Sequence, residues 1–263
     1  MKPICFIAAR AGSRGVPNKN IKIISGKPLI AHTIEKAIKS KIFSHVIVST
    51  DSKKIANISK KYGATVPFIR PKILATDNAD GKDVILHGIK KLNVLGYHYD
   101  VLVSLDCTTP FTKIHDIKRS ITLMKKNHSS VVCSVYEQHH NPYFNIAEIN
   151  SKGYLELVRK KKNRPKNRQD APIVYQMSGL YTINVKDFLK NGKKIFEQIH
   201  PLKIDIESGL MIDTEFEFKL AKLIFEKNKK IWIYHAVQPP SIIKFEPVIY
   251  DDASEIKNKI APL

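Results

Sequence analysis

The residues best suited to chemistry stand in one short segment near the N-terminus. Residues 8–20 read Ala-Ala-Arg-Ala-Gly-Ser-Arg-Gly-Val-Pro-Asn-Lys-Asn, so that small residues are interspersed with the cations Arg10, Arg14 and Lys19. Small residues let a backbone approach a ligand closely, successive amides can bind an anion, and the cations can neutralise phosphates. The segment is not a Walker loop, and it lacks the Gly-x-Gly-x-x-Gly of dinucleotide-binding folds. It predicts a phosphate site of another kind, the alternative being a solvated surface turn.

The elements around this segment alternate between apolar runs and amphipathic stretches. Strands are expected at residues 4–9, 46–50, 65–69, 101–105 and 131–135, with amphipathic helices between them. Because the strands are continuously apolar rather than alternating, they predict a parallel sheet with helices on both faces. Ligands of such sheets bind beyond the carboxyl ends of the strands, where the segment 8–20 would lie.

The pattern changes in the second half of the chain. The elements expected there are a hairpin about residues 151–153, a basic polar run at 159–170, a strand near 180–184, a helix over about 214–227 and a strand at 231–235. We therefore expect a single catalytic domain over residues 1–237, with an excursion at about 138–175, followed by an extended C-terminal tail at 238–263.

Residues 8–20 resemble the signature of the acylneuraminate cytidylyltransferases, the CMP-sialic acid synthetases and their legionaminic and pseudaminic acid relatives. Further segments match in the family's order, namely residues 26–30, 48–52, 70–77, 108–110, 168–170, 178–181 and 212–215. The resemblance covers roughly residues 3–225. It implies a Rossmann-like nucleotide-diphosphosugar transferase fold of the α/β class, in which the excursion forms the dimer contact and overhangs the partner's site.

The resemblance also implies one reaction. The anomeric hydroxyl of a nine-carbon 2-keto sugar acid attacks the α-phosphorus of CTP, giving a CMP-sugar and pyrophosphate for surface glycan synthesis. Transfers of this kind depend mainly on positioning and charge stabilisation, so cations and Mg²⁺ matter more than a covalent nucleophile. The implied cofactor is Mg²⁺, and the implied assembly is a homodimer.

The match assigns roles to individual positions. The residues implied to be catalytic are Arg10, Lys19 and Arg168. The residues implied to bind the nucleotide are Ala9, Arg10, Gly12, Ser13, Lys19, Asn20, Arg70 and Asp106. The residues implied to bind the sugar acid are Arg168, Ser178 and Tyr181.

Two departures from the family pattern concern the metal. Asp106 stands where the family commonly has Gln, and Met211 replaces the first Asp of its Asp-Ile-Asp element, leaving Asp213. Mg²⁺ prefers one or two carboxylates together with phosphate oxygens and water. The hypothesis is that Asp106 and Asp213 share the metal. The alternative is that Asp106 caps its own turn through Thr108.

The sugar side matches less well than the phosphate side. Gln176 stands where the family has an arginine, and Ser178 where it has Asn. Sialic, legionaminic, pseudaminic and shorter keto-sugar acids all remain open as substrates. The two alternatives are a transferase of the same fold for another sugar acid, such as 3-deoxy-octulosonate, and a basic binding protein that has lost catalysis.

Composition limits the partners further. The net charge is +20, but only seven of the 44 basic residues are arginine, the residue favoured for recognising phosphates and bases. The lysines are scattered over amphipathic segments, so neither nucleic acid nor a membrane is expected as a partner. No uncharged run reaches the ~18–20 residues of a membrane helix. Three single cysteines in apolar runs suggest a reducing compartment, and the protein is expected in the cytoplasm.

Overall fold

The computed structural model describes residues 3–160 and 165–237, with the backbone alone for residues 228–237. The chain divides into a compact unit, Met1–Phe225, and a second unit, Glu226–Leu263. The tail expected at residues 238–263 lies outside the described residues. None of the helices in the described ranges is long and apolar enough to cross a membrane.

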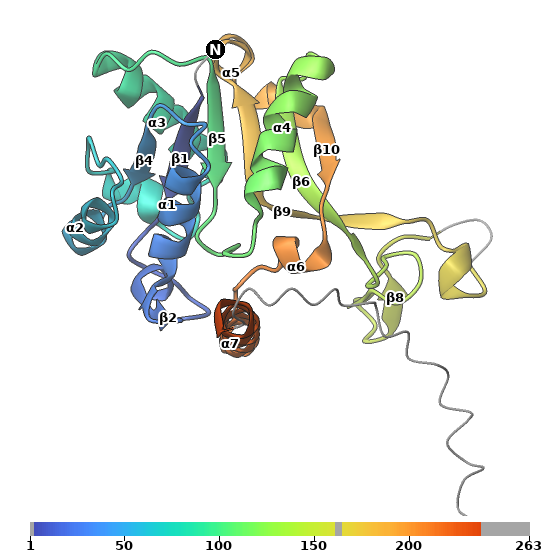
Figure 1. Ribbon diagram of the computed structural model, residues 1–263. Coiled ribbons are helices and arrows are strands. Elements are labelled where there is room, and N and C mark those ends of the chain that lie inside the picture. Colours follow the sequence, from blue (N-terminus) through green and yellow to red (C-terminus); the bar gives the residue numbers. More distant parts are fainter. Residues whose placement is uncertain (1–2, 161–164, 238–263) are drawn as a thin grey trace, which may run out of the picture. The chain divides into compact units, whose positions relative to one another are not determined.

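A six-stranded sheet forms the centre of the first unit, in the order β10-β6-β9-β5-β1-β4 (Figure 1). Its strands are β1 (Ile4–Ala8), β4 (Val46–Ser49), β5 (Val101–Leu105), β6 (Val131–Gln138), β9 (Val174–Asn184) and β10 (Ile199–Lys203). β1 pairs in parallel with β4 and β5, and β10 pairs in parallel with β6. Only β9 runs antiparallel to its neighbours among these strands. The predicted α/β fold with a mostly parallel sheet is therefore confirmed.

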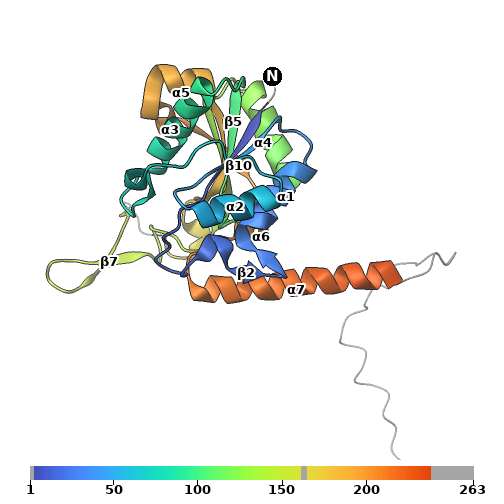
Figure 2. The ribbon, with the colours of Figure 1, turned by 90° about the vertical axis from the view of Figure 1, so that its left-hand side faces the viewer.

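Helices cover both faces of the sheet (Figure 2). On one face lie α1 (Leu29–Lys39), α2 (Lys53–Lys61) and α4 (Ile114–Lys126), whose apolar sides join one buried cluster. On the other lie α3 (Gly81–Val94), α5 (Val185–Asn191) and the 3-10 helix η4 (Gly192–Glu197), which join a second cluster. Each helix buries one apolar stripe, as amphipathic periodicity requires.

A third apolar cluster joins residues near the start of the chain to α7 (Glu215–Val237), the last helix within the described residues. Val16 and Leu29 pack there with Ile212 and Phe218. The short elements η1 (Lys19–Ile21), β2 (Ile23–Ile24), β3 (Lys27–Pro28) and α6 (Ile206–Gly209) complete this region. The cluster brings together segments almost 200 residues apart in sequence.

Two expected strands are wrong. Residues 65–69 form only two isolated bridges, from Thr65 to Ile47 and from Ile69 to Thr50. Pro67 lies between them and has no N–H to donate to a ladder, which explains the interruption. Residues 231–235 belong to α7, because no helix breaker separates that apolar, β-branched run from the helix that begins at Glu215.

The expected excursion connects β6 to β9 and extends beyond one end of these two strands (Figure 1). It contains the predicted hairpin, of β7 (Ala147–Ile149) and β8 (Leu155–Leu157), and the 3-10 helix η3 (Arg168–Asp170). Apolar side chains of the hairpin are exposed, with Ile149 at 74% and Leu155 at 78%.

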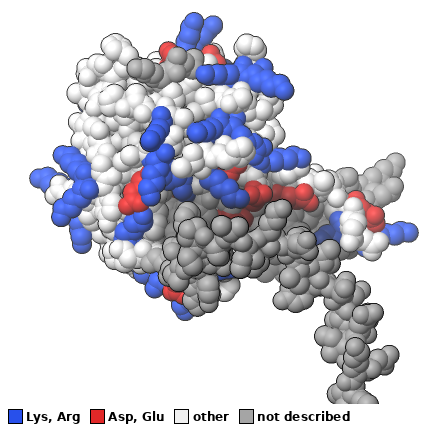
Figure 3. Space-filling model, in the orientation of Figure 1, with Lys and Arg blue, Asp and Glu red and all other residues white. Residues whose placement is uncertain are grey.

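Basic side chains are spread over the visible face in separate groups (Figure 3). Such dispersion agrees with solvated helix faces, where lysine side chains extend into water.

Candidate active site

A cavity of about 520 Å³ opens beyond the carboxyl ends of β1 and β5. We call it the first cavity. The residues predicted for the site that line it are Arg10, Ser13, Lys19, Asn20, Arg70, Asp106 and Asp213. The edge of the sheet at which the cavity lies is the one expected for a ligand in an open α/β sheet.

The loop after β1 is held in place by two of its own residues and by Asp51, which follows β4. The Asn20 amide donates to the carbonyl oxygen of Arg10 at 2.9 Å, and Val16 is fully buried. The Ala11 N–H donates to the Asp51 carboxylate at 3.0 Å, so Asp51 holds the loop rather than facing the cavity. These bonds leave the basic side chains of the loop directed at the cavity wall.

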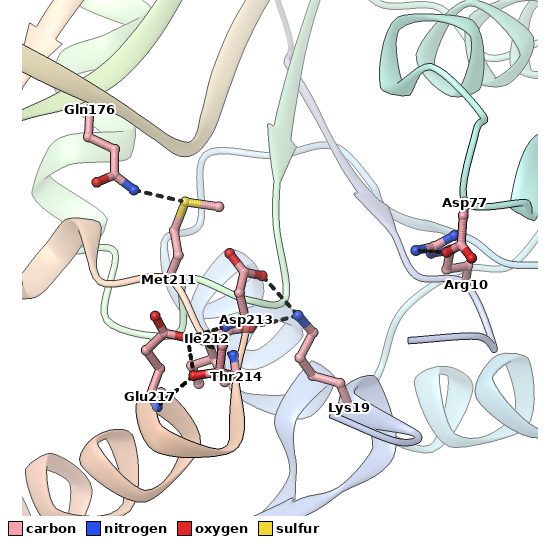
Figure 4. Close-up of polar contacts among 9 residues, drawn as sticks. All are labelled: Arg10, Lys19, Asp77, Gln176, Met211, Ile212, Asp213, Thr214 and Glu217. Atoms are coloured by element: carbon pink, nitrogen blue, oxygen red, sulfur yellow. Dashed lines mark hydrogen bonds and ion pairs between the residues drawn. The ribbon is translucent and has the colours of Figure 1, made fainter. Parts of the chain in front are cut away.

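Lys19 lies where the loop meets the residues before α7 (Figure 4). Its Nζ donates to the Ile212 carbonyl oxygen at 2.7 Å and to Asp213 Oδ1 at 3.0 Å. Only 12% of the Lys19 side chain is exposed. Lys19 therefore carries a largely buried positive charge next to one of the two predicted metal ligands.

Asp77 pairs with both arginines of the loop. Its Oδ1 lies 2.7 Å from Arg10 Nη2, and its Oδ2 lies 2.5 Å from Arg14 Nε. The hydrogen bond from Arg14 lowers the pKa of the Asp77 carboxyl, and Arg10 adds to this effect. Asp77 comes from the segment between the 3-10 helix η2 (Lys72–Ala75) and α3. This carboxylate occupies the guanidinium groups that a phosphate would need.

Arg70 is a buried cation that faces the first cavity. It is 4% exposed, and its Nε has no hydrogen-bond partner among the described residues. Burial lowers the pKa of its guanidinium, because the charged form is poorly solvated there. The charge of Asp51 offsets part of this cost and Arg10 adds to it, so the position is suited to an anionic ligand.

Asp106 follows β5 and is half-buried. Burial and, to a lesser extent, the nearby Asp213 raise the pKa of its carboxyl to about 6, against the opposing charge of Lys19. The turn that follows is closed by the Asp106 carbonyl oxygen, which accepts from Thr109 N and Oγ1 at 3.3 and 3.2 Å. The turn therefore does not depend on the carboxylate, which stands in the cavity lining.

The carboxylates of Asp106 and Asp213 supply only part of the ligand shell that Mg²⁺ requires. Asp106 and Asp213 supply carboxylate oxygens, and the described residues contain no group of three or more His, Cys, Asp or Glu side chains suited to a metal. Mg²⁺ takes few protein ligands and completes its shell with phosphate oxygens and water, so two carboxylates beside a phosphate site fit it. Met211 contributes a thioether, which contacts the Gln176 amide at 3.9 Å and is a poor ligand for Mg²⁺ (Figure 4).

A second cavity of about 480 Å³ shares Ala8 and Asp106 with the first. Its other lining includes Met177, Tyr181, Phe196 and Lys82. The Lys82 ammonium lies 5.1 Å from the centroid of the Phe196 ring. Asp80 beside it accepts from the Lys82 backbone N–H and pairs with Lys193, so the Lys82 side chain is the cation that this cavity offers a ligand.

Four predicted site residues lie outside the linings of both cavities in the described structure. Ala9 is buried in the core, and Gly12 is exposed on the loop. Ser178 is buried and donates to the Gly209 carbonyl oxygen at 3.2 Å. Arg168 is exposed on η3, within the excursion. Their predicted roles stay predictions.

Other residues at the site were not predicted from the sequence. Glu217 bonds to the turn that carries Asp213, and the spacing Thr214-x-x-Glu217 is a capping-box pattern that could have revealed it. Lys82 and Phe196 carry no such pattern, because they meet only through the packing of α3 against η4.

The fold occurs in solved structures. A CMP:2-keto-3-deoxy-manno-octonic acid synthetase complexed with CTP has a TM-score of 0.66 at 16% identity, over 87% of this chain and 100% of that one. A 4-diphosphocytidyl-2C-methyl-D-erythritol synthase from Anaerococcus prevotii has a TM-score of 0.60 at 15% identity, over 85% of this chain and 98% of that one. These likenesses support the predicted nucleotidyltransferase fold.

Curated relatives are more similar in sequence. The chain is 34% identical over 228 residues to the post-translational flagellin modification protein B of Campylobacter coli, covering 86% of this chain and 96% of that protein. It is 33% identical over 238 residues to a CMP-N,N'-diacetyllegionaminic acid synthase of Legionella pneumophila, covering 88% and 99%. A pseudaminic acid cytidylyltransferase of Campylobacter jejuni is 30% identical over 235 residues, covering 87% and 98%. A cytidylyltransferase family model matches residues 4–235, and the chain belongs to that family of nucleotidyltransferases.

Proposed function

We propose that the protein transfers CMP from CTP to the anomeric hydroxyl of a nine-carbon 2-keto sugar acid. The new bond joins the sugar oxygen to the α-phosphorus, the bond to pyrophosphate breaks, and the hydroxyl proton leaves. The observation that carries the proposal is the buried guanidinium of Arg70, which faces a cavity already lined by Arg10, Arg14 and Lys19. Four cations in one cavity suit a triphosphate.

In this proposal the first cavity takes the nucleotide. Arg10 and Arg14 exchange the Asp77 carboxylate for phosphate oxygens, and Lys19 and Arg70 stabilise the charge that develops as pyrophosphate leaves. Asp106 and Asp213 would hold Mg²⁺, which when bound supplies neutralisation of the phosphates. Lys19 and Arg70 already line the cavity before the nucleotide arrives, whereas Arg10 and Arg14 must first leave Asp77.

The second cavity takes the sugar acid. It shares Asp106 and Ala8 with the first, so a hydroxyl held there faces a phosphate held in the first cavity. Lys82 provides a positive charge for the carboxylate, and Met177 and Phe196 provide apolar surface for acyl substituents. Relatives at 29–33% identity are named for legionaminic, pseudaminic and N-acylneuraminic acids, which supports a nonulosonic acid over an octulosonate.

We further propose that the protein acts as a homodimer in the cytoplasm. The exposed apolar residues of the excursion, Ile149 and Leu155 among them, support an interface at the hairpin. Arg168 lies in the same excursion and would act at the partner's site. Three free cysteines, all buried, support a reducing compartment.

Pyrophosphate release, measured with Mg²⁺ for each of four nucleoside triphosphates against a panel of keto-sugar acids, tests the proposal. We expect release with CTP and an N-acylated nine-carbon acid. Equal rates with another nucleotide, or faster turnover of 3-deoxy-octulosonate, would contradict it. CTP binding without turnover of any acid would favour the catalytically reduced alternative.

A further inference from the structure

Glu217, in the first turn of α7, lies behind the first cavity. Its Oε2 accepts hydrogen bonds from the Asp213 N–H at 2.9 Å, the Thr214 N–H at 2.6 Å and the Thr214 hydroxyl at 2.9 Å (Figure 4). The side chain is half-buried, and among the described residues it belongs to the lining of neither cavity. Glu217 therefore acts on any ligand through the residues that it holds.

One of these bonds goes beyond helix capping. The bond from the Thr214 N–H to Glu217, with the return bond from the Glu217 N–H to Thr214 Oγ1 at 3.4 Å, forms an ordinary capping box. The bond from the Asp213 N–H involves the residue before the N-cap Thr214 and is not part of the capping box. It fixes the backbone of the residue whose carboxylate lines the cavity.

The turn held in this way is where three cavity segments meet. The Ile212 N–H donates to the Thr108 carbonyl oxygen at 2.8 Å, which ties the turn to the loop after Asp106. Lys19 donates to the Ile212 carbonyl oxygen and to the Asp213 carboxylate. Gly15 packs against the same backbone, since a Cβ there would lie 1.9 Å from the Asp213 carbonyl oxygen.

The charges around Glu217 keep it ionised. Burial acts to raise the pKa of its carboxyl, but the hydrogen bonds from Asp213 and Thr214 and the charge of Lys19 outweigh burial and lower it. Phe218, the next residue, is buried in the third apolar cluster with Val16 and Ile212, so the helix start cannot shift easily.

We propose that Glu217 is a positioning residue of the nucleotide site, which orients the Asp213 carboxylate and, through it, the Lys19 ammonium. This inference depends on the proposed function, because it takes CTP to be the ligand of the first cavity. Removing the Glu217 carboxylate leaves the Asp213 N–H without its partner and frees the turn on which Lys19 rests. Partners of this kind, one shell behind the ligand, commonly change affinity or activity by 10–100-fold when they are removed.

The test compares Glu217→Ala and Glu217→Gln with a matched control, Glu215→Ala. Glu215 lies in the same helical turn and pairs with Lys22 at 2.6 Å, so its removal deletes an equal charge and an ion pair without touching the Asp213 turn. The readouts are the Kd of CTP in EDTA by calorimetry, the binding of Mn²⁺ by electron paramagnetic resonance, kcat, KM and Tm.

We expect Glu217→Ala to weaken CTP binding in EDTA and Mn²⁺ binding by roughly 10-fold each. Glu217→Gln, whose amide oxygen can accept the same bonds, should recover most of both losses. Glu215→Ala should change either by less than about 2-fold, as an exposed ion pair predicts. That pattern supports positioning by hydrogen bonds.

Equal binding by Glu217→Ala and Glu215→Ala, with only Tm lowered, would overturn the proposal and leave Glu217 as a helix cap. Failure of the Gln variant to recover binding would also overturn it, because charge rather than hydrogen bonding would then be the cause. Failure of the proposed function is distinguishable, since the wild-type protein would then bind CTP without releasing pyrophosphate, or would not bind it.

Discussion

Arg70 is the side chain whose surroundings most require a ligand. We expect Arg70→Met to weaken CTP binding by at least ~10-fold, because a charge-assisted contact to the nucleotide is lost. The same change should raise Tm, because a buried charge with an unbonded Nε is replaced by an apolar side chain. Calorimetry and thermal unfolding measure the two effects. Lys118→Met, at an exposed lysine on α4, is the control. A fall in Tm for Arg70→Met would show that Arg70 has a partner in the free protein.

A substitution at Lys82 should affect binding of the sugar acid but not binding of CTP. Lys82→Ala is expected to raise KM for the sugar acid roughly 10-fold and to leave KM for CTP almost unchanged, because Lys82 lines the second cavity and not the first. Steady-state kinetics with each substrate varied in turn provide the measurement. Lys90→Ala changes an exposed lysine of the same helix and should have no effect. A rise in KM for CTP instead would show that Lys82 contacts the nucleotide rather than the sugar acid.

The basic residues of the site could be predicted from the sequence, whereas the acidic residues that hold them in position could not. The basic loop was recognisable because residues 8–20 stand together in the chain, so Arg10 and Lys19 needed no tertiary information. Asp77 pairs with that loop from more than 60 residues away, and Glu217 supports it only through Asp213, which Lys19 contacts across 194 residues of sequence. Nothing local in the sequence pairs these distant segments with the loop. Arg168, by contrast, was placed by resemblance alone, and one chain does not bring it to either cavity.

The contact between the loop after β1 and the start of α7 can be tested through two glycines of one loop. Gly15→Ala should reduce CTP binding by at least ~10-fold, because its Cβ would lie 1.9 Å from the Asp213 carbonyl oxygen and would push the two elements apart. Gly12→Ala introduces a Cβ with nothing within 4 Å and should bind CTP more tightly than Gly15→Ala; a loss of binding there would come from the nucleotide contact implied for Gly12 rather than from packing within the protein. Calorimetry compares the pair, and circular dichroism checks that both variants are folded. Normal binding by Gly15→Ala would show that the elements can separate without loss.

The elements themselves followed the sequence where periodicity was strong. The strand at residues 101–105 has the predicted bounds, and an amphipathic helix, α4, lies between it and the next strand as predicted. The strand expected at residues 65–69 failed at Pro67, whose missing N–H outweighs the β-branched neighbours. The run at residues 231–235 has strand-like composition but continues a helix, since local propensity is a weak guide without a breaker.

The molecule as a whole should be dimeric. Leu155→Lys places a charge on the exposed apolar hairpin and is expected to convert a homodimer to a monomer at micromolar concentration, because a charged group cannot be buried unpaired in an interface. Val94→Lys, at another exposed apolar position on α3, should leave the dimer intact. Light scattering measures both masses. A wild-type monomer would contradict the proposal, and would leave Arg168 without a site to act on.

The contacts of Lys19 also determine how late in synthesis the site can form. Its two partners in the turn before α7 come 193 and 194 residues later in the chain. A nascent polypeptide that has already formed β1, α1 and β4 on the ribosome still lacks the carboxylate and carbonyl that receive this lysine. In the proposed function, CTP therefore cannot bind in its final manner until translation has passed residue 217. Long-range closure of this kind is slow compared with local folding, so the contact between Lys19 and the turn before α7 forms later than the strands and helices around Lys19.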